Sequence, residues 1–381
     1  MKIAVFVGTR ADLGPLGPVL DELMSRPGVE TIALTGLAFD AAGLAERLGR
    51  PVSSIVQLAE PLQEVDLPAQ LLHGPALSLG AGRLVQEAPV DRLVVLGDRW
   101  ELLHVVPPFV LAGVPVVHLH GGEVTGGAID ERVRHAITKL ADVHCVASRD
   151  AAERVAQLGE EAERVHVTGA PGLDRYAAQE RCGDDELEEL LGVTVHRPLA
   201  LFTYHPPTAS GLPEAGTWTE QALRATLDVC GTVVATHPGM DAGREEILAA
   251  LTRVAAEDER LLVVESLGSR YPAVLASCDV VVGNSSSGVI EAAAVGIPAV
   301  DVGLRQQGRL RSDNVYWSDE GEDAVRAALR HVLQDHFRDR AARAVSVYGD
   351  GTAARRIVDV VLTDPPARSK RFVDGGAHTA K

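Results

Sequence analysis

Residues 279–303 read DVVVGNSSSGVIEAAAVGIPAVDVG, and this stretch contains a complete strand–helix–strand pattern. Two β-branched runs, at 280–282 and 299–302, flank a segment that begins with small polar residues and continues as a helix pattern. Short apolar runs that end at glycine or a polar residue are typical of strands buried in a parallel sheet. The stretch therefore predicts an α/β protein, because strand, helix and parallel strand form the repeating unit of that class.

The same pattern recurs in both halves of the chain. Predicted strands lie at 2–8, 92–97, 114–120, 143–148 and 164–169, and then at 199–206, 232–239, 261–266, 279–287 and 298–303. Helix patterns lie between several of the first strands, at 15–25, 101–113, 130–141 and 151–159. Two successive series of this kind predict two doubly wound parallel sheets, with ligands beyond the carboxyl ends of the strands in a cleft between the domains.

The segment between the two series, 176–197, is charged and has no strand pattern, so it is the predicted linker. We therefore expect an N-terminal Rossmann-like domain at 1–178 and a C-terminal Rossmann-like domain at 179–363. Residues 364–381, which follow a last helix pattern, are expected to form a disordered tail.

Composition and charge exclude several classes of protein. The 381 residues suffice for two cores, and no run reaches the roughly 18 apolar residues of a membrane span. A formal net charge of −17 argues against a nucleic-acid backbone or an anionic membrane as partner. The four cysteines are scattered singly without a CxxC pair, which favours a reducing, cytoplasmic location over a disulfide framework or a zinc knot.

Neither half carries a fingerprint for a bound nucleotide cofactor. The first strand is followed by GTRADLGPLG at 8–17, which lacks the GxGxxG spacing, and the chain contains no GxxxxGK[ST]. Bound NAD and P-loop ATPase activity are therefore disfavoured, and no cofactor is expected.

Charged side chains follow two of the first predicted strands. Arg10 and Asp12 come directly after the strand at 2–8, where an arginine suits a phosphate. The alternative is a helix-capping aspartate beside a surface arginine. Asp98 follows the strand at 92–97, where a carboxylate is either a helix cap or a catalytic group.

The stretch HLHGGEVTGGAIDERVRH at 118–135 gathers titratable groups next to flexible backbone. His118, His120, Glu123 and Asp130 suit proton transfer near neutral pH. A metal site is the second interpretation, but no third histidine or cysteine with ligand spacing supports it, so no metal is expected. The third is plain structure, with Asp130 capping a helix and one histidine in the core.

Single histidines end two strands of the second half. His205 ends the strand in FTYHP, and His237 ends the next one, four residues before Asp241. A lone histidine at a strand end is more often structural, so these residues are candidates only as members of a larger set.

The polar loop of the opening stretch is more specific. Ser285–Ser287 supply hydroxyls and free amides at a helix start, which suits a phosphate. Glu291 lies about one helical turn further, in position to accept hydrogen bonds from a ribose diol. Arg305 lies near the sheet edge and suits phosphate pairing, whereas Arg309 and Arg311 are read as surface residues. The alternative is a serine-rich cap with a solvated glutamate.

Several of these motifs together resemble the UDP-N-acetylglucosamine 2-epimerases. The motifs run in the family's order from about residue 2 to 315: GTRADLGPL, VVLGDRWE, HLHGGEVTGGAIDERVRHAITKLADVH, HVTGAPGLD, FTYHP, VGNSSSGVIEA and PAVDVGLRQQGR. They are most similar to the hydrolysing branch, which forms N-acetylmannosamine for sialic-acid-type sugars. The resemblance implies a GT-B-like fold, a last helix that often returns to the first domain, a UDP-sugar substrate, and a homodimer or homotetramer.

The resemblance also implies a set of site residues. The catalytic candidates are Asp98, His120, Glu123, Asp130 and His205. The candidates for binding UDP are Arg10, Asp12, His205, Asp241, Ser285, Ser286, Ser287, Gly288, Glu291 and Arg305. The chain departs from the family pattern at His120, where many relatives have a carboxylate, so that His120 or Glu123 must take this role. It departs again at Gly239, where relatives usually have asparagine.

The chemistry that the resemblance implies is an anti-elimination. UDP leaves carbon 1 while a base removes the proton from carbon 2, which gives a 2-acetamidoglucal; addition with inversion at carbon 2 follows. Release of UDP gives N-acetylmannosamine, and this hydrolysing outcome is the preferred prediction. The alternatives are return of UDP to give UDP-N-acetylmannosamine for antibiotic or glycan biosynthesis, a related sugar such as diacetylbacillosamine, a GT-B glycosyltransferase, and a non-catalytic UDP-sugar sensor.

Overall fold

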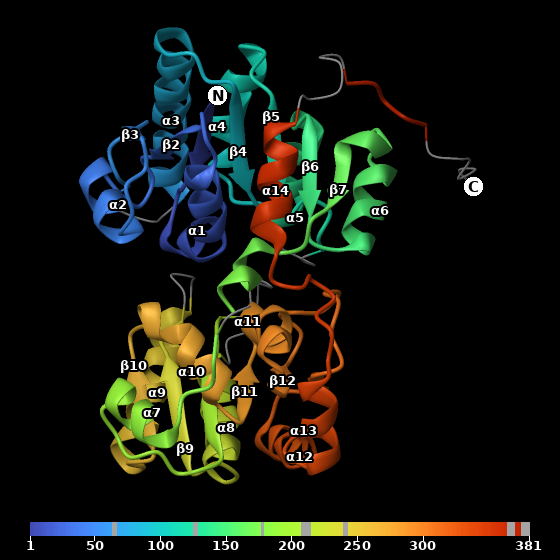
Figure 1. Ribbon diagram of the computed structural model, residues 1–381. Helices are drawn as coiled ribbons and strands as arrows, with labels where there is room; N and C mark the ends of the chain where they lie inside the picture. The colour runs from blue at the N-terminus through green and yellow to red at the C-terminus, as the bar shows by residue number, and fades with distance from the viewer. Residues whose placement is uncertain are drawn as a thin grey trace. The chain divides into compact units, whose positions relative to one another are not determined.

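The computed structural model describes residues 1–62, 67–124, 129–176, 179–206, 215–238, 243–363 and 370–374. The chain forms two compact units. The N-terminal unit comprises Met1–Val124, Ile129–Asp174 and the described residues from Gly351 onward, and the C-terminal unit comprises the described residues from Arg175 to Asp350. Each unit is built around one parallel sheet with helices on its faces (Figure 1).

The sheet of the N-terminal unit has the order β3-β2-β1-β4-β5-β6-β7. Its strands are β1 (Lys2–Phe6), β2 (Glu30–Thr35), β3 (Ser54–Gln57), β4 (Arg92–Leu96), β5 (Val116–Leu119), β6 (Val143–Val146) and β7 (Val165–Val167). The helices of this unit are α1 (Arg10–Ser25), α2 (Ala41–Leu48), α3 (Leu67–Glu87), α4 (Leu102–Leu111), α5 (Ile129–Leu140), α6 (Arg149–Gln157), α14 (Ala353–Leu362) and the short 3₁₀ segments η1 (Ala162–Arg164) and η2 (Pro171–Arg175).

The sheet of the C-terminal unit has the order β10-β9-β8-β11-β12-β13. Its strands are β8 (Leu199–Thr203), β9 (Thr232–Thr236), β10 (Leu261–Val264), β11 (Val280–Gly283), β12 (Ala299–Val302) and β13 (Val315–Ser318). Its helices are α7 (Asp184–Leu191), α8 (Ala215–Leu227), α9 (Arg244–Glu257), α10 (Tyr271–Ser277), α11 (Ser286–Ile290), α12 (Glu322–Val332) and α13 (Asp335–Ala342), with 3₁₀ segments η3 (Gly268–Arg270) and η4 (Ala292–Val295).

Both sheets have the Rossmann order, in which the chain first builds outward in one direction and then reverses. The reversal lies between β1 and β4 in the first sheet and between β8 and β11 in the second. The prediction of two Rossmann-like, doubly wound parallel sheets is therefore confirmed. Strands β2, β3 and β13 were not predicted, because their sequences are short or interrupted by polar residues.

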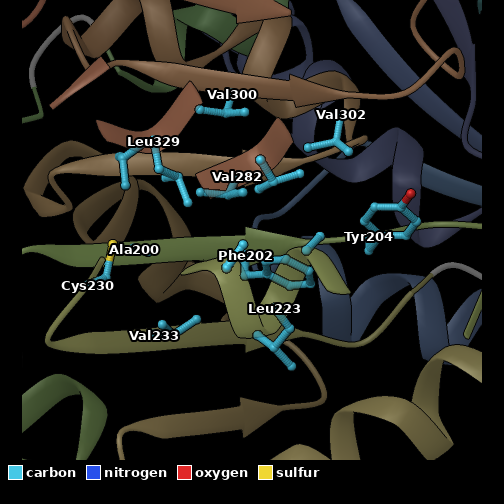
Figure 2. Packing of buried hydrophobic residues seen from close by; sticks show 14 of the residues in the cluster. Ala200, Phe202, Tyr204, Leu223, Cys230, Val233, Val282, Val300, Val302 and Leu329 are labelled. Carbon is cyan, nitrogen blue, oxygen red and sulfur yellow. The ribbon is translucent and has the colours of Figure 1, made fainter. Parts of the chain in front are cut away.

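The core of the C-terminal unit shows how strand alternation divides the side chains between two layers. Ala200, Phe202 and Tyr204 point to one face of the sheet, where they pack with Leu223 of α8 and Leu329 of α12 (Figure 2). Leu199 and Leu201 of β8 belong to a separate cluster on the other face. This alternation with period two is what an inner strand buried on both faces requires.

Helix α14 belongs to the N-terminal unit although it follows the second sheet in the chain. Its buried Ile357 and Val361 pack in the same cluster as Leu16 and Leu20 of α1. Asp174 caps this helix, because its two carboxylate oxygens accept hydrogen bonds from the first two amides of α14 at 2.9 and 2.6 Å. The sequence placed the domain boundary at 178/179, whereas the described chain passes between units at 174/175 and again at 350/351.

Residues 370–374 lie within the predicted tail and contact the N-terminal unit. Lys370 donates hydrogen bonds to carbonyls at the carboxyl end of α5, to that of Lys139 and to that of Ala141, just after the helix, at 2.8 Å each. It also forms an ion pair with Glu160 at 2.8 Å. The backbone amide of Val373 donates to the carbonyl of Gly159 at 3.0 Å. A cation at a helix carboxyl end is favourable, so these contacts stabilise the end of α5. The remainder of the predicted tail lies outside the described residues.

Across the described parts of the chain, no helix combines the length and the apolar composition that crossing a lipid bilayer requires.

Loss of the Lys370 contacts should destabilise the N-terminal unit. We expect Lys370→Met to lower the free energy of unfolding by about 1–2 kcal/mol, because Glu160 is fully buried and then keeps fewer cationic partners. Lys2→Met is the matched control, since the ion pair of Lys2 with Glu30 is exposed at both ends, and it should change stability by less than about 0.5 kcal/mol. Urea denaturation measures both, and equal effects would contradict the assignment.

Candidate functional site

Charged side chains gather at the carboxyl edge of the first sheet, beside its reversal point. Arg10 and Asp12 follow β1, Asp98 follows β4, and His120 and Glu123 follow β5. In an open parallel sheet, ligands bind at this edge. The sheet thus brings together groups that are far apart in the sequence.

Arg134 of α5 connects three segments of this edge. Its guanidinium is 1% exposed and donates from Nε to Asp98 Oδ2 at 3.0 Å, with a second bond from Nη2 to the same oxygen. It also donates from Nη1 to the backbone carbonyl of Glu123 at 2.5 Å and to Glu131 Oε2 at 2.7 Å. Because both bonds to Asp98 end on Oδ2, Arg134 fixes this carboxylate and leaves Oδ1 for another partner.

His120 and Glu123 form a second pair at the same edge. The distance from His120 Nδ1 to Glu123 Oε1 is 2.6 Å, and both side chains are mostly buried. His120 has a φ of +62°, a conformation that residues other than glycine rarely adopt. Such strain persists only where the surroundings impose it, so the loop after β5 is held in this conformation by its neighbours. The bond to Glu123 orients the imidazole. The structure therefore brings an imidazole and a carboxylate into hydrogen-bond contact, and their part in proton transfer stays a prediction.

His118 has a different role from His120. It is fully buried, its Nε2 donates to the carbonyl of Gly97 at 2.7 Å, and its Nδ1 lies 3.3 Å from the hydroxyl of Thr138. Burial lowers the pKa of His118 to about 3, so its ring is neutral. It is the structural histidine of this stretch, and it holds the residue that directly precedes Asp98.

Gly122 is required for packing. Its φ is +77°, and a Cβ at this position would lie 2.2 Å from the carbonyl oxygen of Ala151 in α6. Glycine at this position therefore lets the loop close against α6.

Arg99, Glu101 and Asp12 form a third group, next to β1. Glu101 is 1% exposed and accepts a hydrogen bond from Arg99 Nε at 2.7 Å. Burial by itself would lower the pKa of Arg99, but the negative charges of Glu101, Asp12 and Asp130 raise it above its usual value. Gly8 makes room for this group, because a Cβ there would lie 3.0 Å from Glu101 Oε1.

Asp12 is the helix cap that one interpretation of the sequence expected. It is the third residue of α1 and forms a capping box with Thr9, whose amide it accepts at 2.7 Å. Arg10 is exposed, as the structural interpretation expected. However, burial raises the pKa of Asp12 to about 6, against an ordinary value of 3.8. The residue is therefore a cap and also a titratable group at the edge of the sheet.

Asn284 organises the corresponding edge of the C-terminal unit. It is 1% exposed, and its side-chain amide makes two bonds with the backbone of His205, accepting from the amide at 2.7 Å and donating to the carbonyl at 2.9 Å. Its own carbonyl accepts from Arg305 at 3.2 Å and from Gln306 at 2.9 Å. Asn284, which directly follows β11, therefore holds the segments that follow β8 and β12. These two strands lie on opposite sides of the reversal point.

His205 and Arg305 lie close enough for their charges to interact. Burial, and then the positive charge of Arg305, lower the pKa of His205 to about 4. The imidazole is therefore neutral at pH 7, and Arg305 supplies the positive charge of this group.

The serine loop begins a short helix. Ser285 caps α11 by accepting from the amide of Ser287 at 3.4 Å, and Gly288 faces the sheet, where a Cβ would lie 3.4 Å from Val281. Ser287 donates its hydroxyl to Glu291 Oε2 at 2.6 Å and also contacts the hydroxyl of Tyr271. Ser287 and Glu291 are thus held to each other, while Ser286 opens the helix with Ser285.

Some predicted residues are outside these groups. Asp241 lies outside the described residues, and the nearby His237 is half-buried at the end of β9. Asp130 is the second residue of α5, and its charge acts on Arg99. No cluster of three or more His, Cys, Asp or Glu residues suited to a metal occurs in the part of the chain that the structure describes.

The sequence interpretation did not name several residues that organise the two edges: Arg99, Glu101, Arg134, Asn284 and Tyr271. The sequence could have indicated two of these residues, because Arg99 and Glu101 lie in the same motif as Asp98, VVLGDRWE, at the end of a predicted strand. Arg134 sits inside a helix pattern and Asn284 directly precedes the serines, and neither position indicates burial.

Known proteins to which this chain is similar include 2-epimerases of UDP-linked sugars. Residues 76–362 match the family model described as UDP-N-acetylglucosamine 2-epimerase. A Legionella pneumophila UDP-N,N'-diacetylbacillosamine 2-epimerase (hydrolyzing) is 30% identical over 374 residues, covering 96% of each chain. A Neisseria meningitidis UDP-N-acetylglucosamine 2-epimerase is 29% identical over 395 residues, covering 98% of this chain and 99% of the relative.

A solved structure supports the fold over both units. The crystal structure of the UDP-GlcNAc 2-epimerase from Neisseria meningitidis bound to UDP-GlcNAc matches with a TM-score of 0.69 at 14% identity, covering 95% of this chain and 100% of that chain. The likeness covers both Rossmann-like units, which confirms the predicted GT-B-like fold. The predicted cleft between the domains stays a prediction.

Asp12 should make stability depend on pH in an identifiable window. Because its pKa is about 6 in the folded protein and near 3.8 ordinarily, the folded state binds more protons between these values, and the free energy of unfolding falls as the pH rises through them. Asp12→Asn removes this effect. We expect the variant to gain about 2–3 kcal/mol relative to the unsubstituted protein between pH 4 and pH 7 in urea denaturation. A difference independent of pH would contradict the burial argument.

Proposed function

The chain belongs to the UDP-N-acetylglucosamine 2-epimerase family, and on this premise we propose that it inverts carbon 2 of a UDP-linked N-acetylamino sugar, with UDP as the leaving group. The observation that carries the proposal is the set of side chains that gather at the carboxyl edges of the two sheets. One presents partly buried carboxylates and an imidazole bonded to one of them, and the other presents an arginine with a serine-capped helix start.

The nucleotide is assigned to the edge of the C-terminal unit. Arg305 supplies the positive charge for the diphosphate, and Ser285 and Ser286 supply amides at the start of α11. Glu291, oriented by Ser287, accepts hydrogen bonds from the ribose hydroxyls. His205 acts as a neutral hydrogen-bonding group, since its lowered pKa keeps it uncharged at pH 7. From the first unit, Arg10 and Asp12 are assigned to UDP as well.

Proton transfer is assigned to the edge of the N-terminal unit. Asp98 is fixed by Arg134 through one oxygen, and His120 shares a short hydrogen bond with Glu123. Positioned carboxylates and imidazoles of this kind transfer protons effectively near neutral pH. Asp130, close to Arg99, completes the proposed set. The proposal requires residues of both edges to contact one substrate molecule.

The proposed reaction proceeds in two halves. A base removes the proton from carbon 2 as the bond between carbon 1 and the UDP oxygen breaks, and the electron pair of the carbon–hydrogen bond forms the double bond of a 2-acetamidoglucal. Arg305 and the amides of α11 stabilise the negative charge of the departing diphosphate. A proton then returns to the opposite face of carbon 2, and an oxygen nucleophile adds to carbon 1.

We propose that this nucleophile is water, so that the products are UDP and the free mannose-configured sugar. The Legionella relative carries the word hydrolyzing in its name, which supports this outcome. That relative is also named for UDP-N,N'-diacetylbacillosamine, which makes this sugar the second candidate substrate beside UDP-N-acetylglucosamine. Return of UDP to carbon 1 is the remaining outcome.

Solvent exchange tests the reaction class. In D₂O with UDP-N-acetylglucosamine or UDP-N,N'-diacetylbacillosamine and no acceptor, proton NMR should show deuterium entering carbon 2, together with free sugar and UDP. A glycosyltransferase or a sensor would leave carbon 2 protonated. If all sugar remained UDP-linked while deuterium entered, the hydrolysing outcome would be refuted and the epimerase class retained.

Asp98→Asn tests the carboxylate. We expect turnover to fall by at least about 100-fold, because the group loses its ability to move a proton, while UDP affinity stays within about threefold. Asp150→Asn, an exposed aspartate of α6 in the same unit, is the matched control and should retain full turnover. Unchanged turnover in Asp98→Asn would remove this residue from the proposed mechanism.

Arg305→Met tests the nucleotide edge. Loss of a charge-assisted bond to phosphate should weaken UDP binding by roughly 10- to 100-fold in isothermal titration calorimetry. Arg330→Met, at an exposed position on α12, is the control and should bind UDP normally. Equal affinities of the two variants would argue against a diphosphate site at Arg305.

A further inference from the structure

A short segment beyond α14 occupies a fitted position on the N-terminal unit, and we call residues 370–374 the docking segment. The ring of Phe372 lies against Gly159, where a Cβ would be only 2.3 Å from the ring. The amide of Val373 donates to the carbonyl of Gly159 at 3.0 Å, and the ammonium of Lys139 lies 5.2 Å from the centroid of the Phe372 ring. The ends of a chain are usually poorly ordered unless such contacts hold them. The receiving surface is therefore shaped for this segment.

Lys370 brings the positive charge of the docking segment into a mostly buried position. Its side chain is 17% exposed, and its Nζ donates to three carbonyls, those of Thr138 at 3.4 Å and of Lys139 and Ala141 at 2.8 Å each. The fully buried carboxylate of Glu160, 2.8 Å away, neutralises the charge. These partners replace the water that burial removes from an ammonium group. One side chain of the docking segment thus holds the carboxyl end of α5.

Thr138 connects Lys370 with the backbone next to Asp98. The carbonyl of Thr138 accepts from Lys370, and its hydroxyl lies 3.3 Å from Nδ1 of His118. His118 in turn donates from Nε2 to the carbonyl of Gly97 at 2.7 Å, and Gly97 directly precedes Asp98. Because the neutral ring carries its proton on Nε2, Nδ1 is the acceptor and the Thr138 hydroxyl is the donor. A series of oriented hydrogen bonds therefore leads from the docking segment to the end of β4.

Helix α5 provides a second connection, to the side chain of Asp98. Arg134 lies about one turn before Thr138 on this helix and donates from Nε to Asp98 Oδ2 at 3.0 Å. The backbone bonds of a helix keep its turns at a fixed spacing, so a shift at one end moves the residues of the next turn as well. The backbone and the carboxylate of Asp98 thus both depend on the position of α5, which Lys370 holds at its end.

We propose that Lys370 is a positioning residue for Asp98, so that the docking segment is a working part of the enzyme. The inference rests on the proposed role of Asp98 in proton transfer. Lys370 acts through Thr138, His118 and the backbone of α5. A displacement of about 1 Å can lower a rate by roughly 100-fold, and a partial loosening of these connections should have a smaller effect of the same kind.

The turnover of Lys370→Met tests the proposal, at a temperature at which circular dichroism shows that the variant is folded. We expect kcat to fall by roughly 10-fold, because Asp98 is less well placed, while KM and the affinity for UDP stay within about twofold. Lys370→Arg keeps a cation with several donors and should recover kcat to within about threefold of the unsubstituted protein. A folded Lys370→Met variant with unchanged kcat would overturn the proposal.

Lys139→Met is the matched control. Lys139 also pairs with Glu160, at 2.6 Å, but it donates to the carbonyl of Leu158 at 2.9 Å and not to that of Thr138. The variant removes an ion pair from the same carboxylate, and methionine keeps an apolar contact with the ring of the docking segment. We expect it to lose stability but to keep kcat within about twofold, since the connection to Asp98 remains. An equal loss of kcat in both variants would assign the effect to the ion pairs and overturn the positioning role.

Thr138→Val tests the connection itself, since it removes the hydroxyl that orients His118. Combined with Lys370→Met, it should lower kcat by clearly less than the product of the two single effects, because both changes act through the same bonds. Nitrogen-15 NMR of the His118 ring gives a readout that is independent of turnover. The Nδ1 resonance should shift in Lys370→Met and stay in place in Lys139→Met. Independent effects on kcat, or an unchanged resonance in Lys370→Met, would contradict a connection through Thr138.

The positioning role and the proposed function fail in different ways. If Asp98→Asn is inactive while a folded Lys370→Met variant keeps full turnover, only the positioning role is refuted. If Asp98→Asn keeps full turnover, Asp98 leaves the mechanism, and the positioning role is refuted with it.

Discussion

The buried guanidinium of Arg134 is the constraint on which the candidate site depends. A charge that is almost completely removed from water must be paired, and an unpaired one would cost several kcal/mol. Arg134 meets this requirement with Asp98, the carbonyl of Glu123 and Glu131. These partners belong to the end of β4, the loop after β5 and α5. The need to neutralise one charge therefore fixes three segments in one arrangement.

Asn284 has the equivalent role in the C-terminal unit, with a neutral group instead of a charge. The side-chain amide of Asn284 forms hydrogen bonds with the backbone N–H and C=O groups of His205. The backbone carbonyl of Asn284 accepts hydrogen bonds from Arg305 and Gln306. A buried amide that lost these partners would leave several polar groups unsatisfied. In both units one buried side chain thus joins segments that follow neighbouring strands, which fixes the loops at the carboxyl edge of the sheet.

The two edges differ in the kind of charge that they present. The first edge gathers carboxylates around Arg99 and Arg134, and its imidazole at His120 lies against a carboxylate. The second edge has Arg305 beside a neutral His205 and the amides of α11. These environments support the proposed division between proton transfer at the first edge and anion binding at the second, which suits the proposed loss of a proton from one carbon and of a diphosphate from its neighbour.

The sequence by itself determined the fold class, the two series of strands and the strand ends at which the site residues lie. These properties follow from local patterns, since β-branched runs ending at polar residues specify buried parallel strands whatever their partners. A core histidine within 118–135 was one of three interpretations of that stretch, and the sequence did not say which histidine it would be. His118 and His120 are two residues apart on the same strand end, and only the neighbouring carbonyl of Gly97 and the carboxylate of Glu123 distinguish them.

Tertiary structure alone decided the burial of Arg134 and Glu101, the raised pKa of Asp12 and the contacts of Lys370 with α5. The reason is common to all of them. Burial and pairing depend on residues that are distant in the chain, and a local pattern carries no information about which distant group will lie opposite.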